Sequence, residues 1–217
     1  MSNRFLVNSA YTLSSYNESN FSVNFDNLRD GYGPSGSDRR HLLNINAIVQ
    51  LPWNVQLALV SAIQSGTPFN PFLAQLDLNG DGTRNDRLPG ISQNGVNRGA
   101  SKDDLRKTVA NFNQTYAGKR DSLGTLIQPV NLPADFRTGD SAMSQDVRVT
   151  KKFQFTERIG AEVVAEIFNI FNIANLTIPS SAGNLYSSGF GKPNARIDNL
   201  FGSAGPRAAQ FGLRINF

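Results

Sequence analysis

Apolar and polar residues alternate with a period of two along several parts of the chain. In 41–51 the apolar residues fall on one face of an extended chain, and asparagine and glutamine fall on the other. The alternation resumes at 55–66 after the break Pro52-Trp53-Asn54. Successive side chains of a strand point to opposite faces, so this pattern predicts two strands joined by a tight turn.

The segment 158–172 fits a strand and also fits a helix. Alanine and glutamate favour a helix, and Val163, Ile167 and Ile170 have the spacing of a helical stripe. The β-branched residues and the short break at 155–158 favour a strand that pairs with 143–154. We therefore expect a second hairpin over 143–172.

The whole pattern predicts six strands, each long enough to cross a membrane at a tilt. They are expected at about 4–16, 41–51, 55–66, 143–154, 158–172 and 206–217. The connections after the second and fourth strands are short, whereas those after the first, third and fifth span roughly 24, 76 and 34 residues. Short turns at one end and long polar loops at the other are typical of an antiparallel up-and-down transmembrane β-barrel.

The two faces of the predicted strands differ in polarity. Most charged residues within the predicted strands lie on the face opposite the apolar residues; they are Arg148, Lys152, Glu162, Glu166 and Arg214. Lys151 is the main exception. The side chains expected to face lipid are Leu43, Ile45, Val49, Leu57, Leu59, Val149, Val163 and Ile167. Aromatic residues near the short turns are expected to form an interfacial girdle; they are Phe5, Trp53, Phe153, Phe155 and Phe217. Alternation alone fits a soluble sheet with one solvated face equally well.

Composition removes several function classes. The 217 residues carry a net charge of +4 with no block of like charges, so no nucleic-acid partner is expected. The chain has no cysteine, and His41 is its single histidine. Thiolate catalysis, disulfides and multi-histidine metal sites are thereby excluded. Glu162 and Glu166 lie about 13 Å apart along a strand and are interpreted as lumen charges. We expect no enzymatic activity, and the sequence shows neither a signal peptide nor a transmembrane helix.

The segment DLNGDGTRNDR, residues 77–87, suggests a calcium site as the one candidate cofactor. Its acidic and amide residues have the odd spacing of an EF-hand loop, and Gly82 occupies the sharp-turn position. Leu88 stands where that loop has a bidentate glutamate. The candidate ligands are Asp77, Asn79, Asp81, Thr83, Asn85 and Asp86. The alternative is a solvated turn rich in Asp and Asn.

Four motifs give the chain a family likeness. They are SGTPFNP (65–71), DLNGDGTRNDR (77–87), AEIFNIFNIANL (165–176) and GPRAAQFGLRINF (205–217). In this order they resemble the C-terminal part of a TonB-dependent outer-membrane transporter of the Oar-like group, which has a carboxypeptidase-regulatory-like N-terminal domain. The resemblance implies a barrel of about 22 strands with long extracellular loops. It also implies a plug domain, a link to the TonB complex and the bacterial outer membrane as the location.

The chain shows no plug, TonB box or signal peptide, so we expect 1–217 to be the C-terminal barrel segment of a longer transporter. Such a fragment is expected not to transport its unidentified substrate alone. Six strands are fewer than the roughly eight of the smallest barrels of this type, so the remaining strands of the parent are expected partners. The first and sixth strands are the expected edges. The resemblance makes the last strand an assembly signal for the barrel insertion machinery, through Phe211, Leu213, Ile215 and Phe217.

Two other classes of protein remain open at this point. An extracellular β-sandwich or adhesion module braced by calcium would share the alternation and the Asp-rich loop, with its apolar faces packed together. A secreted hydrolase would need a nucleophile and a base, which the sequence does not identify.

Overall fold

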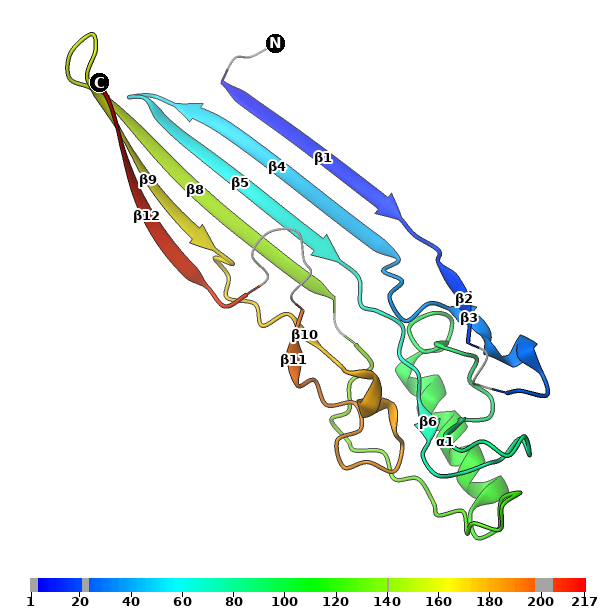
Figure 1. Ribbon diagram of the computed structural model, residues 1–217. Helices are drawn as coiled ribbons and strands as arrows, with labels where there is room; N and C mark the ends of the chain where they lie inside the picture. The colour runs from blue at the N-terminus through cyan, green and yellow to red at the C-terminus, as the bar shows by residue number, and fades with distance from the viewer. Residues whose placement is uncertain (1–3, 21–23, 140, 198–204) are drawn as a thin grey trace.

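The computed structural model describes residues 4–20, 24–139, 141–197 and 205–217. Six long strands form one antiparallel sheet in the order β1-β4-β5-β8-β9-β12, so each strand pairs with the next long strand along the chain (Figure 1). Their bounds are β1 (Phe5–Leu13), β4 (His41–Leu51), β5 (Val55–Gln64), β8 (Ala142–Gln154), β9 (Gly160–Phe168) and β12 (Ala208–Asn216). The prediction of six up-and-down strands is confirmed, with β1 and β12 as the edges.

The register separates the two faces of the sheet as the alternation predicted. Leu57 lies opposite Val49 on one side and Val149 on the other, and the same face continues to Ala165 and Phe211. All eight residues expected to face lipid belong to this apolar face. Glu162 and Glu166 belong to the other face, because they pair with Lys152 and Arg148.

Both short turns lie where the sequence placed them. In the first, Trp53 and Asn54 have φ values of 62° and 56°, the left-handed conformation that tight hairpin connections use. In the second, the backbone N–H of Phe155 donates to the carbonyl of Ile159 at 3.0 Å. The hydroxyl of Thr156 accepts from the N–H of Ile159 at the same distance. The two hairpins are therefore closed by local hydrogen bonds and local backbone conformation.

The segment 160–168 is a strand, so the helical alternative for it is wrong. The strand is shorter than the predicted 158–172 because the chain turns away at Asn169, which has a φ of 47°. The buried Asn169 side chain holds this turn: its Nδ2 donates to the carbonyl of Ile173 at 2.8 Å and its Oδ1 accepts from the N–H of Ile173 at 3.0 Å. The hydrogen bonds of the Asn169 side chain thus compete with the backbone pairing that would continue β9.

The three long connections fold together into a cap at the end of the sheet opposite the short turns (Figure 1). We use the term cap for the described residues of 14–40, 65–141 and 169–207. It contains the elements β2 (Asn17–Ser19), η1 (Leu28–Gly31), β3 (Tyr32–Pro34), β6 (Phe72–Leu73), β7 (Asp86–Arg87), α1 (Lys102–Tyr116), β10 (Leu176–Thr177), η2 (Ser180–Gly183) and β11 (Ala195–Arg196). The expectation of long connections made only of loops was incomplete.

The principal hydrophobic core lies in the cap and not in the sheet. Fourteen buried apolar side chains form one cluster, which comprises Phe69, Leu73, Leu76, Leu88, Ile91, Val96, Leu105, Val109, Phe112, Ile127, Val130, Phe136, Leu185 and Phe190. The large apolar residues of the sheet, in contrast, include many exposed ones. The connections thus bury a core while the sheet leaves its apolar face exposed. Such a face is expected to contact an apolar environment.

Helix α1 contributes one side of that core. The hydroxyl of Ser101 accepts from the N–H of Asp104 at 3.1 Å, and the Asp104 carboxylate accepts from the N–H of Ser101 at 3.0 Å. This reciprocal capping box starts the helix. Leu105, Val109 and Phe112 are buried at the helical spacing of four and three residues. No helix among the described residues is long and apolar enough to cross a membrane.

Candidate functional site

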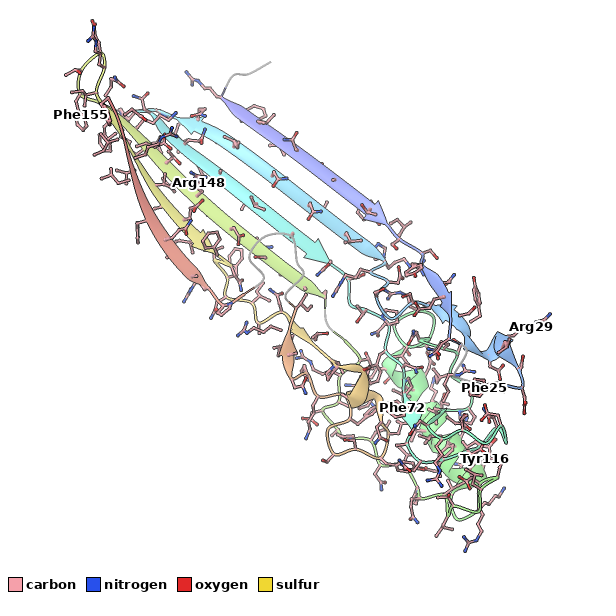
Figure 2. All side chains as sticks on the ribbon, viewed as in Figure 1. Phe25, Arg29, Phe72, Tyr116, Arg148 and Phe155 are labelled. Atoms are coloured by element: carbon pink, nitrogen blue, oxygen red, sulfur yellow. The ribbon has the colours of Figure 1, made fainter. Side chains whose placement is uncertain are left out.

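Charged residues gather on one half of the polar face of the sheet. The Nε of Arg148 on β8 lies 3.4 Å from the Glu166 carboxylate on β9, and the Nζ of Lys152 lies 4.0 Å from that of Glu162. The amide of Gln210 on β12 donates to Glu166. Figure 2 labels Arg148 in the middle of the sheet. The glutamates therefore have cationic partners on a neighbouring strand, as expected for lumen charges rather than for a catalytic pair.

The Asp-rich loop is held by its own acidic side chains. The two carboxylate oxygens of Asp77 accept from the N–H groups of Gly80 and Gly82, at 2.7 and 3.0 Å. Gly82 has a φ of +83°, which a residue with a Cβ adopts rarely, so the glycine predicted at the sharp turn has a conformational role. The side-chain oxygen of Asn79 accepts from the N–H of Asp81 at 2.9 Å.

The other predicted ligands bond to neighbouring backbone. Asp81 accepts from the N–H and the hydroxyl of Thr83, at 2.8 and 2.6 Å, and from the N–H of Phe25 in the first connection. The side-chain oxygen of Asn85 accepts from the N–H of Gln75 at 3.2 Å, so this amide turns towards the start of the loop. The loop therefore ties the first and second long connections together through Asp81.

Asp86 is a buried acid of this loop that also lines a hollow. Its carboxylate accepts from the N–H groups of Leu78 and Asn79. Burial raises the pKa of Asp86, the two N–H donors oppose that rise, and the negative charges of Asp77 and Asp81 add to it. The negative charges of Asp77 and Asp81 thus act on Asp86, and a bound cation would offset them.

The calcium site stays a prediction. Within the described residues no three histidine or acidic side chains are grouped closely enough to hold a metal ion. A site here would accordingly need the amide oxygen of Asn79 and backbone carbonyls, such as that of Thr83, to complete the shell of about six to eight oxygens that calcium takes.

Calcium at roughly millimolar concentration, the affinity range of extracellular modules, is expected to raise the melting temperature of the cap. The variant Asp77→Asn should reduce this shift, because it removes a charge that calcium would neutralise. Asp103→Asn is the matched control, since Asp103 lies on α1 and pairs with Arg106 instead. Differential scanning calorimetry of the full-length protein measures the shift. An unchanged melting temperature with calcium would contradict the prediction.

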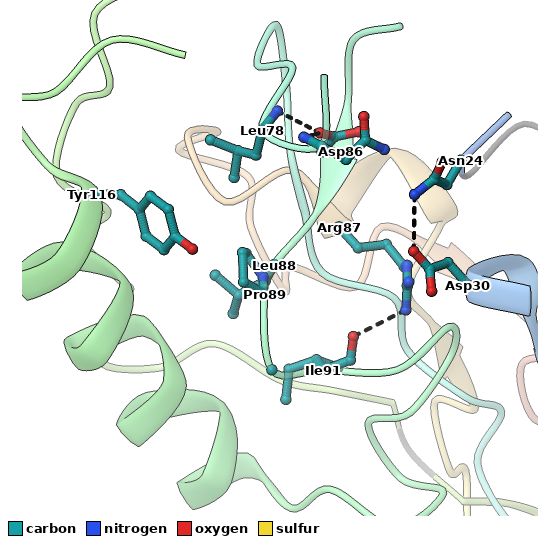
Figure 3. A pocket seen from close by; sticks show the side chains of 11 residues that line it. Asn24, Asp30, Leu78, Asp86, Arg87, Leu88, Pro89, Ile91 and Tyr116 are labelled. Atoms are coloured by element: carbon teal, nitrogen blue, oxygen red, sulfur yellow. Dashed lines mark hydrogen bonds between the residues drawn. The ribbon is translucent and has the colours of Figure 1, made fainter. Parts of the chain in front are cut away.

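A hollow of about 200 Å³ lies beside this loop, between the first and second long connections (Figure 3). Arg87 lines it and donates from Nη1 to the carbonyl of Ile91 at 3.2 Å. Asn24 donates to the Asp30 carboxylate at 2.9 Å on the other side. Burial lowers the pKa of Arg87, and the carboxylates of Asp30 and Asp86 oppose this change. The hollow thus combines a cation, two acids and an apolar wall formed by Leu88, Pro89, Ile91 and Tyr116.

The sequence did not indicate this hollow. Asp30 and Arg87 are far apart in the chain, and no local motif links them. The Asp-rich motif identified Asp86, but it did not indicate that this acid also faces a hollow.

The comparison with known protein families decides which kind of sheet this is. The model of the outer membrane beta barrel domain matches residues 1–210. The chain belongs to the outer membrane beta barrel domain family. Its location is the bacterial outer membrane, as predicted, and membrane lipid is a partner of the barrel. No curated protein and no solved structure matches the chain.

Membership of this family explains the exposed apolar face of the sheet. In an outer-membrane barrel the outward face meets hydrocarbon, and the inward face is polar. A β-sandwich would pack its apolar face on a second sheet, yet side chains such as Leu57, Val149 and Val163 remain exposed. The β-sandwich alternative is therefore wrong. The expectation that the barrel protein is not an enzyme stays a prediction.

The short-turn end of the barrel wall carries the predicted aromatic residues. Trp53 and Phe155 are exposed, and the rings of Phe153 and Phe155 stack with centroids 6.4 Å apart (Figure 2). Lys151, the charge that lies on the apolar face, turns its Nζ to the carbonyl of Trp53 and lies over the Phe153 ring. Its ammonium group thereby reaches the aromatic end of the strand, as a snorkelling lysine does at a membrane boundary.

The last strand presents the predicted assembly residues on the apolar face. Phe211, Leu213 and Ile215 pair with Ala165, Val163 and Ala161 of β9 and are exposed. Phe217 is 99% exposed and lies at the end of the sheet with the short turns (Figure 1). Within the described residues β12 has no strand on its other side. Its role in assembly stays a prediction.

Proposed function

We propose that the chain is the C-terminal segment of the barrel of a TonB-dependent transporter that takes up an unidentified substrate. On this proposal the segment does not transport by itself. The observation that carries the proposal is the open sheet, in which β1 and β12 each have one edge without a partner strand in the described part of the chain.

The open edges support a larger barrel. Unpaired backbone N–H and C=O groups cost several kcal/mol each in hydrocarbon, so a sheet in the membrane must close. Six strands fall short of the roughly eight that the smallest such barrels use. Pairing of β1 and β12 with further strands of the same protein removes both edges. A wide barrel of about 22 strands then leaves a lumen large enough for a plug.

The polar face and the cap support an uptake role. The ion pairs of Arg148 with Glu166 and of Lys152 with Glu162 would line a wet lumen. Another hollow of about 450 Å³ is lined by residues of all three long connections, among them Glu18, Asn70, Gln93 and Thr177. The buried Oε1 of Gln93 has no hydrogen-bond partner among the described residues, so a ligand in this hollow could donate a hydrogen bond to it.

The test compares the full-length protein with the chain 1–217. The periplasmic domain of TonB, fixed to a resin, is expected to retain the full-length protein in detergent and not the chain 1–217. The chain has no cysteine, so a cysteine introduced at Gly212 of β12 should form a disulfide with one introduced in the first strand of the barrel. Absence of TonB binding would contradict the transporter, whereas absence of the disulfide would contradict closure through β12.

Replacing Phe217 is expected to lower the amount of the full-length protein in the outer membrane. An aromatic residue at the headgroup boundary anchors the end of the strand, and Phe217→Ala removes that anchor. Leu123→Ala is the control, because Leu123 is also an exposed apolar residue but lies in the cap. Immunoblots of outer-membrane fractions give the measurement. Equal levels of the two variants would show that Phe217 is not an assembly signal.

A further inference from the structure

Positive charge is concentrated where β4 and β5 enter the cap. Arg39 and Arg40 directly precede β4, and Arg98 of the second connection lies against the same strand ends. A hollow of about 590 Å³ opens there; its lining includes Arg40, His41, Ser65 and Arg98, with glycine backbone around them. This hollow is separate from the Asp-rich loop and from the hollow at Arg87.

Arg98 and Asp38 neutralise each other, so the Asp38 carboxylate does not also balance the charges of Arg39 and Arg40. The Nε of Arg98 donates to the Asp38 carboxylate at 2.9 Å, and its Nη2 donates to the carbonyl groups of Asp38 and Gly66. The same carboxylate accepts from the hydroxyl of Ser14 at 2.8 Å. These bonds and the charge of Arg98 outweigh the effect of burial and hold the pKa of Asp38 below its ordinary value.

Arg39 and Arg40 lack a carboxylate partner within the described residues. The Nε of Arg40 is buried and has no hydrogen-bond partner there. Arg39 is partly buried and donates one bond, from Nη1 to the carbonyl of Ser65 at 3.1 Å. Burial, and then the positive charge of Arg98, lower the pKa of Arg39. Two partly buried cations beside a third, with one carboxylate among them, form a site that an anion would stabilise.

The hollow lies at the boundary between the apolar face and the cap. His41 is in register with Leu13 of β1, on the apolar face, and its Nδ1 is 2.8 Å from the hydroxyl of Tyr11. The two rings stack with centroids 6.2 Å apart. Tyr11 is six residues from Phe5 of the aromatic end, about 20 Å along the strand, so the two rings lie towards opposite ends of β1. Tyrosine with its hydroxyl towards water is typical of the membrane interface.

We propose that this hollow binds a phosphate group of a phosphorylated lipid headgroup in the outer leaflet. The guanidinium of Arg40 offers a planar fork that fits two phosphate oxygens. The hydroxyl of Ser65 accepts from the N–H of His41 at 3.1 Å, so its proton remains free to donate to the phosphate. Arg39 and Arg98 add positive charge beside it. The proposal depends on the outer-membrane location and not on transport or on TonB.

The experiment measures lipid binding by the full-length protein in nanodiscs. The probes are nanodiscs of phosphatidylcholine alone, nanodiscs that also contain lipid A, and inorganic phosphate added to the second kind. Native mass spectrometry counts lipid A molecules retained by the protein. The double variant Arg39→Gln, Arg40→Gln is compared with Arg29→Gln, Arg120→Gln, which removes the same charge from exposed positions of the cap. Heat-modifiable migration on gels confirms that each variant is folded.

The wild type and the control variant are expected to retain lipid A, and the Arg39, Arg40 variant is expected to bind it roughly tenfold to a hundredfold more weakly, because charge-assisted hydrogen bonds are lost. Added inorganic phosphate should not displace the lipid. Equal retention by both variants would overturn the proposal. Displacement by inorganic phosphate would assign the hollow to a soluble anion and would overturn the lipid headgroup as its ligand.

Discussion

Leu59→Arg is expected to destabilise the folded barrel by about 2–4 kcal/mol, the cost of an arginine that faces lipid near the bilayer midplane. Leu59 on β5 lies between Ala47 and Val147, in the middle of the apolar face. An arginine there cannot reach water at either interface without distorting its strand. Urea titration of the full-length protein in lipid vesicles, followed by tryptophan fluorescence, gives the change in the free energy of unfolding.

The next residue on the same strand supplies the control. Val60 faces the other side of the sheet and is in register with Asp146, so Val60→Arg places the same charge in the wet lumen near an acid. The two variants differ in which face carries the arginine and not in its depth. Equal destabilisation would show that the apolar face is not the one that meets lipid.

The strands were predictable because each of them obeys a local rule. The alternation determines which residues share a face of the sheet. A shift of the strand pairing by one residue would move every side chain of the shifted strand to the opposite face. The register places Leu57 with Val149, and Glu162 with Lys152, as the alternation required. Where a prediction failed, as at the end of β9, a single side chain overrode the ladder: the Asn169 amide bonds to Ile173 and turns the chain.

The cap was predictable only in part. Ser101 and Asp104 have the spacing of a capping box, and Leu105, Val109 and Phe112 form a helical stripe, so the sequence contained a signal for α1 that the alternation of period two does not detect. The way in which the three connections pack against one another has no such local signal. The hollow at Arg87 depends on contacts between residues from separate connections. That Arg39 and Arg40 lack a carboxylate partner among the described residues depends on the pairing of Arg98 with Asp38.

The packing of the cap matters for function because it fixes the loops that bear the hollows. Arg87 and Asp86 belong to β7, next to the core residue Leu88. Gln93 lies between the core residues Ile91 and Val96. A ligand that approaches from outside would therefore meet side chains held by a hydrophobic core, rather than side chains on independently moving loops.

Loss of one aromatic ring from that core should unfold the cap and leave the barrel wall intact. Phe112 on α1 is 2% exposed, and its ring stacks on that of Tyr116 with centroids 5.3 Å apart. Phe112→Ala is expected to cost about 3–5 kcal/mol, because it removes buried apolar surface and leaves a cavity. The six long strands of the sheet contain none of the fourteen core residues, so the sheet should keep its pairing.

Limited proteolysis of intact cells separates these two effects. In the Phe112→Ala variant, added protease is expected to cut within 65–141, while the barrel stays heat-modifiable on gels as in the wild type. Gln114→Ala is the matched control, since Gln114 is an exposed residue of the same helix and alanine favours a helix. Protection of 65–141 equal to that of the wild type would mean that the cap core does not hold these connections in place. Loss of heat-modifiability would mean that the cap and the barrel wall fold as one unit.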